Sequence, residues 1–101
     1  MRRGTTPELT FTLPFEISTI RTIWVTFSQK GKEVFTADNS KCEMNGNEVK
    51  VNLSQRDTLR LTSDAPLEIQ VRVLTDIGTA LASNVIRTTV NRILKEGEIH
   101  G

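Results

Sequence analysis

The chain has 101 residues, which fits one domain, and its 13 Lys and Arg residues nearly balance its 12 Asp and Glu residues. The balanced charge argues against a dedicated nucleic-acid-binding protein, and no basic amphipathic helix is present to hold a membrane surface. Cys42 is the single cysteine, which excludes an internal disulfide and a multi-cysteine metal site. The fold must therefore rest on packing of a hydrophobic core.

Apolar and polar residues alternate with period two in the first third of the chain, which predicts strands. In residues 9–15 the apolar side chains share one face and Thr10 and Thr12 share the other, and Pro14 either ends this strand or places it at a sheet edge. Residues 20–29 and 32–37 continue the pattern. The Lys30-Gly31 pair separates these last two strands as a tight hairpin turn, because Gly31 can adopt a positive φ.

A second hairpin is predicted with its turn at Asn45-Gly46-Asn47, between strands at 41–44 and 48–53. Asn-Gly suits a type I′ turn, because both of its central positions require a positive φ. This pair is the strongest hairpin signal in the chain.

The second half of the chain contains a helical turn and two further strands. Ser54 is placed to cap a single helical turn, with Asp57 in the capping-box position three residues later. Residues 67–73 show the cleanest alternation in the chain, with four apolar side chains on the core face. The last strand is expected over residues 79–90, with a bulge or kink near Ser83, where the alternation slips.

About seven short strands and no long helical period predict an all-β, immunoglobulin-like antiparallel β-sandwich, with a small β-barrel as the alternative. We expect one domain over residues 1–101, with short arms at 1–7 and 91–101. The N-terminus lacks an apolar run after its charges, so we expect no signal peptide.

The residues that support catalysis are few. His100 is the only histidine and lies next to the C-terminus, where positioning is poorest. Cys42 lies in a predicted strand with no histidine placed to activate it, so a buried, inert thiol is expected. The carboxylates match no catalytic or calcium-binding motif. We therefore expect a protein that is not an enzyme, with no catalytic residues, no cofactor and no metal.

Trp24 is the first candidate interface residue. Its side chain is predicted to point away from Ile23, Val25 and Phe27, so a core on their side leaves Trp24 outward, where a large aromatic often anchors an interface. The alternative is a buried tryptophan, as in many sandwiches, but that would turn the other three side chains outward.

The two arms carry the other candidate interface residues. Arg2 and Arg3 belong to a basic, extended N-terminal arm that is able to add to the sheet edge of a neighbouring subunit, or to remain disordered. Ile93, Leu94 and Ile99 follow the last predicted strand and either dock on a neighbour or fold back on their own domain.

Several segments resemble a group of short structural proteins encoded by phages and prophages of Firmicutes. They are residues 3–7 (RGTTP), 9–15 (LTFTLPF), 51–59 (VNLSQRDTL), 69–74 (IQVRVL) and 80–84 (ALASN). The chain is also similar, more weakly, to the immunoglobulin-like N-terminal domains of phage upper baseplate proteins, although it lacks their long downstream part. The resemblance implies a virion or tail-associated protein, and it implies no catalytic residue.

The function expected from these observations is that of a non-enzymatic phage virion, tail or baseplate-associated structural protein. Its partners would be itself, other virion proteins or both, in a homo-oligomer or larger assembly, with no nucleic acid or membrane bound. It would occupy the host cytoplasm during assembly and then the virion. The alternatives are a small phage-encoded binding protein or inhibitor of a host protein, and a carbohydrate-binding module for the host surface.

Overall fold

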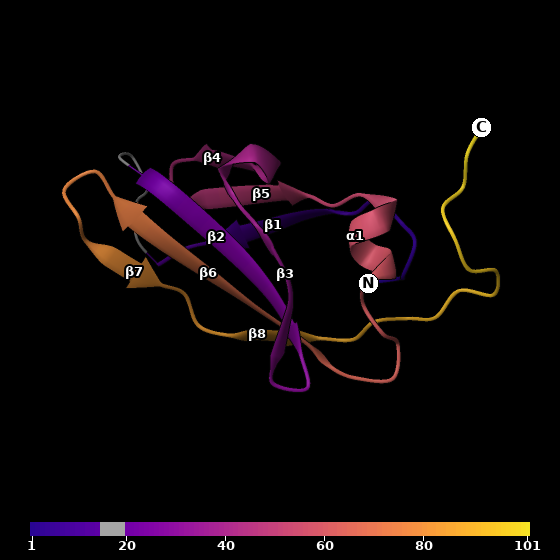
Figure 1. Cartoon of the computed structure of the whole chain (residues 1–101). Coiled ribbons are helices and arrows are strands. Elements are labelled where there is room, and N and C mark those ends of the chain that lie inside the picture. Colours follow the sequence, from indigo (N-terminus) through magenta and orange to yellow (C-terminus); the bar gives the residue numbers. More distant parts are fainter. Residues whose placement is uncertain (15–19) are drawn as a thin grey trace.

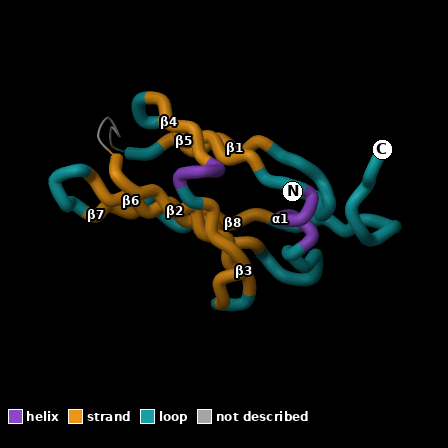
Figure 2. Tube along the Cα trace, turned by 45° about the horizontal axis from the view of Figure 1, so that its top comes forward, coloured by secondary structure: helices purple, strands orange, loops and turns teal. Residues whose placement is uncertain are grey.

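The computed structural model describes residues 1–14 and 20–101, which form two antiparallel sheets packed face to face (Figures 1 and 2). The small sheet has the order β1-β5-β4, with β1 at Glu8–Thr12, β5 at Glu48–Asn52 and β4 at Cys42–Asn45. The large sheet has the order β3-β2-β6-β7, and β8 also pairs with β6. Its strands are β2 (Ile20–Gln29), β3 (Lys32–Ala37), β6 (Leu67–Thr75), β7 (Ala80–Ala82) and β8 (Ile86–Thr88).

The chain crosses between the two sheets three times, after β1, after β3 and after β5. In immunoglobulin nomenclature the small sheet follows the order B-E-D and the large sheet C′-C-F-G. The predicted immunoglobulin-like antiparallel β-sandwich is therefore confirmed, and the alternative of a small barrel is wrong. In the described part of the chain β1 pairs only with β5 and β3 only with β2, so both sheets keep free edges.

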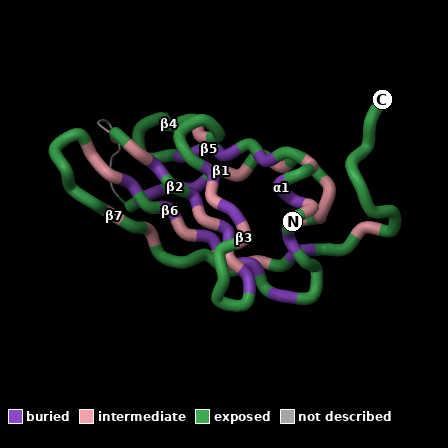
Figure 3. Tube along the Cα trace, viewed as in Figure 1, coloured by how far each residue is buried: buried purple, intermediate pink, exposed green. Residues whose placement is uncertain are grey.

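The core lies between the sheets, where the alternating apolar side chains meet (Figure 3). In β2, the side chains of Ile23, Val25 and Phe27 have no exposed surface, and the four apolar residues of β6 from Leu67 to Val73 are also buried. The core faces predicted for these two strands are confirmed. Phe15, which was predicted to join the core face of the first strand, lies outside the described residues.

The two hairpins differ from each other in turn type. Lys30 and Gly31 have φ values of 54° and 75°, so both central residues are left-handed, as a type I′ turn requires. In the second hairpin Asn45 pairs with Glu48, so the two central residues are Gly46 and Asn47. Gly46 has a φ of 63° and Asn47 does not have a positive φ, so this is a II′-type turn with glycine first. The predicted hairpin over Asn45-Gly46-Asn47 is confirmed, and the type I′ expected for its turn is wrong.

A helical turn, α1 (Gln55–Leu59), connects β5 to β6 at one end of the sandwich. The predicted capping box is confirmed, because Ser54 Oγ accepts a hydrogen bond from Asp57 N at 3.1 Å and Asp57 Oδ2 accepts one from Ser54 N at 3.0 Å. A short 3-10 turn, η1 (Asn39–Lys41), precedes β4, and its Lys41 Nζ lies 2.5 Å from Asp57 Oδ2. This ion pair joins η1 to α1.

The strand predicted over residues 79–90 divides into β7 and β8. Ser83 N donates to Val71 O at 2.8 Å, but Val71 N donates to the hydroxyl Oγ of Ser83 at 3.0 Å instead of a carbonyl. The side chain of Ser83 therefore takes over one ladder hydrogen bond, and the chain leaves the sheet before it pairs again at Ile86. The predicted irregularity near Ser83 is confirmed. It separates β7 from β8, so residues 1–14 and 20–101 contain eight strands, where about seven were predicted.

Candidate functional site

Trp24 lies in the middle of the large sheet, on the side that faces away from the core. Strand periodicity places it there, because its neighbours Ile23 and Val25 point inward. The indole is 47% exposed, and the guanidinium carbon of Arg72, the residue directly across from it on β6, lies 5.6 Å from the ring centroid. Such a cation–π contact holds the indole and the guanidinium together on the surface.

The outward side of β3, β2 and β6, with the adjoining Asp38, is called the Trp24 face below. Its side chains are Thr22, Trp24, Thr26, Ser28, Glu33, Thr36, Asp38, Glu68, Gln70, Arg72 and Leu74. Trp24 and Arg72 line two adjoining hollows on this face. The face thus presents tryptophan and arginine, two of the three side-chain types that are most enriched in the energetic centres of protein interfaces.

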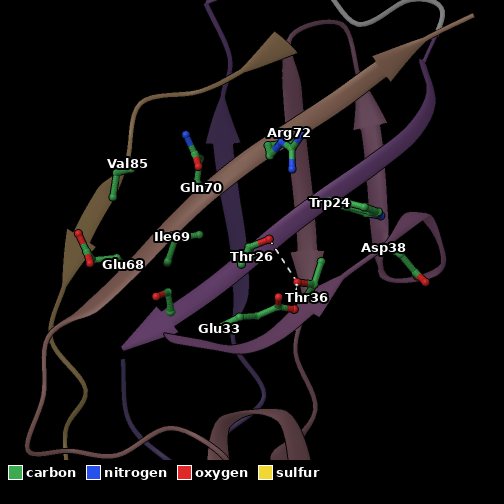
Figure 4. A pocket seen from close by; sticks show the side chains of 11 residues that line it. Trp24, Thr26, Glu33, Thr36, Asp38, Glu68, Ile69, Gln70, Arg72 and Val85 are labelled. Atoms are coloured by element: carbon green, nitrogen blue, oxygen red, sulfur yellow. Dashed lines mark hydrogen bonds between the residues drawn. The ribbon is translucent and has the colours of Figure 1, made fainter. Parts of the chain in front are cut away.

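The larger hollow has a volume of about 590 Å³ and a lining of mixed polar and apolar character (Figure 4). Thr26 Oγ1 and Thr36 Oγ1 lie 3.2 Å apart, and Thr36 Oγ1 donates to Glu33 Oε2 at 2.6 Å. The carboxylates of Asp38 and Glu68 also line it, and Glu68 accepts from Arg87 Nε at 3.1 Å. The hollow is therefore rich in hydroxyl and carboxylate oxygens beside one aromatic ring.

The smaller hollow, of about 310 Å³, is mainly apolar and lies on the other part of the Trp24 face. It is lined by Thr22, Trp24, Arg72, Val73, Leu74 and Ala80. The small side chain of Ala80 lies across from Leu74 in the β6–β7 ladder, which leaves space above the sheet. An aliphatic or aromatic side chain of a partner fits the chemistry of this hollow.

Asp38 is held rigidly beside Trp24. It caps η1, with Oδ1 accepting from Ser40 N at 3.0 Å and from Ser40 Oγ at 2.6 Å. The hydroxyl of Ser40, followed by its backbone N–H, holds the pKa of the Asp38 carboxyl below its usual value, so the group stays charged at neutral pH. The turn is fixed to β2, because Ile23 N donates to Asn39 Oδ1 at 2.8 Å and Asn39 Nδ2 donates to the carbonyl of Arg21 at 3.0 Å.

The N-terminal arm is bound to its own domain. Arg2 forms a parallel bridge with Asn91, and its guanidinium donates to the carbonyl of Arg92 at 2.7 Å. The guanidinium of Arg3 donates to the carbonyls of Leu61 at 2.6 Å and Leu59 at 2.9 Å, and it also contacts the carboxylate of Glu96. Both arginines therefore make intramolecular contacts at the α1 end of the sandwich.

The apolar residues of the C-terminal arm differ in exposure. Ile93 is half-buried, and its Cδ1 would lie 3.0 Å from a side-chain carbon built on Gly4. Leu94 and Ile99 are 92% and 80% exposed, although Gln55 fixes the backbone of Ile99 through two hydrogen bonds of 2.7 and 3.1 Å. The structure brings Arg2, Arg3 and the C-terminal segment together near α1, and it places Trp24 elsewhere, on β2.

The groups considered for chemistry lie apart from one another. Burial, followed by the charge of Asp38, raises the pKa of the Cys42 thiol to about 11, so little thiolate forms at neutral pH. His100 is exposed in the C-terminal arm. Within residues 1–14 and 20–101, no three His, Cys, Asp or Glu side chains are grouped so as to hold a metal ion. In the same described residues no helix has the length and apolar content needed to cross a membrane.

Sequence reasoning found Trp24 but missed Arg72 and Asp38, which lie on either side of it. Arg72 occupies an outward position of the strand predicted over 67–73 and Asp38 follows the strand predicted over 32–37, and charged residues are common at such positions. Only the pairing register between strands shows that they flank the tryptophan, and no sequence signal specifies that register across the 47 residues that lie between Trp24 and Arg72.

No family model matches the chain, and no curated protein matches its sequence. The chain is similar to a solved structure described as the V domain of amphioxus IgVJ-C2, with 13% sequence identity and a TM-score of 0.37. That alignment covers 92% of this chain and 97% of the V domain.

Proposed function

We propose that this chain is a non-enzymatic assembly protein that acts through protein–protein contacts, as a structural component of a phage virion associated with the tail or baseplate. The observation that carries the assembly role is Trp24, a large aromatic that is half exposed in the centre of a sheet face and stacked with Arg72. The core does not require an outward tryptophan, and aromatic and arginine side chains are enriched where proteins bind one another.

The assignment to a virion rests on the resemblance of residues 3–7, 9–15, 51–59, 69–74 and 80–84 to short phage structural proteins. Under this proposal the chain is made in the host cytoplasm and is then incorporated into particles at a fixed copy number. Virion proteins usually repeat one interface many times, which suits a small domain with one prominent binding face.

The test of the virion role is quantitative mass spectrometry of phage particles purified from cells that produce this chain. The expected result is a constant copy number per particle for the natural chain and a loss of incorporation for Trp24→Ala at an unchanged cellular level. Met44→Ala is the matched control, because Met44 is an exposed apolar residue on the small sheet. Absence of the natural chain from particles would refute a virion role and would favour a phage-encoded protein that binds a host protein.

A saccharide of the host surface is the second candidate ligand, and the composition of the larger hollow favours it. Hydroxyl and carboxylate oxygens of Thr26, Thr36 and Glu33 lie in the same hollow as the indole of Trp24. Sugars bind through hydrogen bonds from their hydroxyl groups and through stacking of their C–H faces on aromatic rings. Because Trp24 is the only tryptophan, its fluorescence reports directly on this site, and an unchanged spectrum with host cell-wall saccharides would exclude this candidate.

A further inference from the structure

We propose that the Trp24 face binds the same face of a second copy of this chain, about a two-fold axis parallel to β2. This inference rests on the proposed function, because it names one partner for the face that is proposed to mediate assembly.

Arg72 and Asp38 lie at the same level along β2, on opposite sides of Trp24. Trp24 is directly across from Arg72 in the β2–β6 ladder. In the β2–β3 ladder Val25 is across from Ala37, and Asp38 continues in an extended conformation, with φ of −100° and ψ of −165°. Figure 4 shows Trp24 between Arg72 and Asp38, and all three line the same hollow.

A two-fold axis parallel to β2 exchanges the two sides of the sheet, so that β6 of one copy faces β3 of the other. Trp24 lies close to this axis and meets the Trp24 of the second copy. Arg72 then faces Asp38 of the second copy, and the symmetry repeats this pair on the other side of the axis. Gln70 faces Thr36 in the next row, since both are across from Thr26, and their amide and hydroxyl groups are able to hydrogen-bond.

Arg72 and Asp38 are both able to form an ion pair with a second copy of the chain. Within the described residues Arg72 forms no ion pair, and its guanidinium makes a cation–π contact with the indole ring of Trp24. Both hydrogen bonds that Asp38 accepts as the cap of η1 go to Oδ1, so its Oδ2 has no partner among the described residues. An arginine and a carboxylate of this kind form directional, charge-assisted hydrogen bonds.

The row of residues that contains Ser28 weakens the proposed dimer, because it brings two carboxylates of like charge together. Ser28 is across from Glu33 on β3 and from Glu68 on β6, so the same axis places Glu68 opposite Glu33 of the second copy. The ion pair of Glu68 with Arg87 reduces the repulsion between these carboxylates, and like charges across an interface still weaken it. The geometry therefore predicts a reversible dimer that Glu33→Lys makes tighter.

The experiment is analytical ultracentrifugation of the full chain from about 1 µM to 1 mM, together with Trp24 fluorescence, which reports on burial of the single tryptophan. We expect a monomer–dimer equilibrium that Trp24→Ala or Arg72→Asp weakens at least about tenfold. Glu33→Lys should strengthen the dimer about five- to tenfold. In the reciprocal variant, Arg72→Asp combined with Asp38→Arg should recover most of the loss caused by Arg72→Asp alone.

The controls separate loss of the contact from loss of the fold. Lys50→Asp makes the same change of charge as Arg72→Asp on the outward side of the small sheet, and it should leave dimerisation unchanged. Because Asp38 caps η1, the reciprocal variant is first checked by thermal unfolding, and if its fold is damaged the strengthening by Glu33→Lys decides the question.

A strict monomer at 1 mM overturns this inference. So does a dimer that is indifferent to Trp24→Ala and Arg72→Asp but is lost when residues 92–101 are removed, because the contact would then lie in the C-terminal arm. Neither result alone refutes the proposed function. If Trp24→Ala still abolishes incorporation into particles, the face binds another virion protein and not a second copy.

Discussion

Replacement of Asp57 by alanine is expected to destabilise the fold without touching the Trp24 face. Asp57 is only 7% exposed, and its Oδ2 accepts hydrogen bonds from Ser54 N at 3.0 Å and from Lys41 Nζ at 2.5 Å. It therefore closes the capping box of α1 and also joins this helix to η1. Both contacts converge on the same oxygen, so removal of the carboxylate abolishes both at once.

The magnitude follows from these two contacts. A hydrogen bond to a charged acceptor contributes about 1.5–3 kcal/mol, which applies to the one from Ser54 N. The contribution of Lys41 is smaller, about 1 kcal/mol or less, because its side chain is 40% exposed and its charge returns to water. Asp57→Ala should therefore lower the free energy of unfolding by about 2–3 kcal/mol. For a domain of this size that corresponds to a fall in Tm of about 10–20 °C.

Urea and thermal unfolding followed by circular dichroism measure this loss of stability. The variant Asp57→Asn separates the contribution of the hydrogen bond from Ser54 from that of the ion pair with Lys41. Asparagine keeps an oxygen for Ser54 N but removes the charge that pairs with Lys41, so it should cost less than alanine. A free energy of unfolding within about 0.5 kcal/mol of the natural chain for Asp57→Ala would refute the reasoning, because ordinary surface substitutions cause changes of that size.

The pH dependence gives a second measurement on the same residue. Burial acts to raise the pKa of Asp57, but the hydrogen bonds from Lys41 and Ser54 outweigh it, and the pKa lies below its usual value. A carboxyl whose pKa is lower in the folded state stabilises the fold above its unfolded pKa of about 3.9 and loses that contribution as the pH falls through the folded value. The free energy of unfolding of Asp57→Asn should therefore fall less than that of the natural chain as the pH is lowered through this range.

Three further predictions test the core and the cysteine. Gln29→Leu should lower the free energy of unfolding in urea by about 2–4 kcal/mol, since Gln29 bonds the backbone of Thr62 and Ala65 through three hydrogen bonds of 2.7–3.0 Å. Val71→Asp should leave the chain unfolded at 25 °C by circular dichroism, because it places an unpaired charge at a fully buried position, and a cooperative natural-like transition would contradict this. Alkylation of Cys42 at pH 8 should be about 100-fold slower in the folded chain than in urea, because its pKa is about 11 instead of 9.0, and equal rates would contradict this.

The fold was predictable because its strands carry a local signal. The alternation in β2 and β6 sets which side of each strand is buried, and both burial patterns follow it. The capping box of Ser54 and Asp57 is equally local, because it needs only two residues three positions apart. The errors arise where two backbone solutions are close in energy. The turn after Asn45 is an example, because an Asn-Gly-Asn sequence offers a glycine to more than one type of tight hairpin turn.

The candidate site was less predictable, because it depends on contacts between distant segments. Arg72 and Asp38 reach Trp24 only through the pairing of β6 and β3 with β2. For Arg2 and Arg3, by contrast, the contacts between distant segments engage two candidate interface residues within the domain itself. Arg2 and Arg3 are charged and close to a terminus, which suggests freedom, yet the carbonyls of Arg92, Leu61 and Leu59 bind their guanidinium groups within the domain. Neither outcome follows from residue types alone.

The outward position of Trp24 separates binding from stability. Turning its side chain into the core would expose Ile23, Val25 and Phe27, each of which is completely buried, at a cost of about 1.5–3 kcal/mol per side chain. The strand period therefore fixes the indole on the surface, where it contributes little to folding beyond its contact with Arg72. A substitution at Trp24 should consequently affect partner binding far more than unfolding, whereas substitution of Val25, the next residue, should do the reverse. That contrast between adjacent positions is what a binding face on a strand-built scaffold requires.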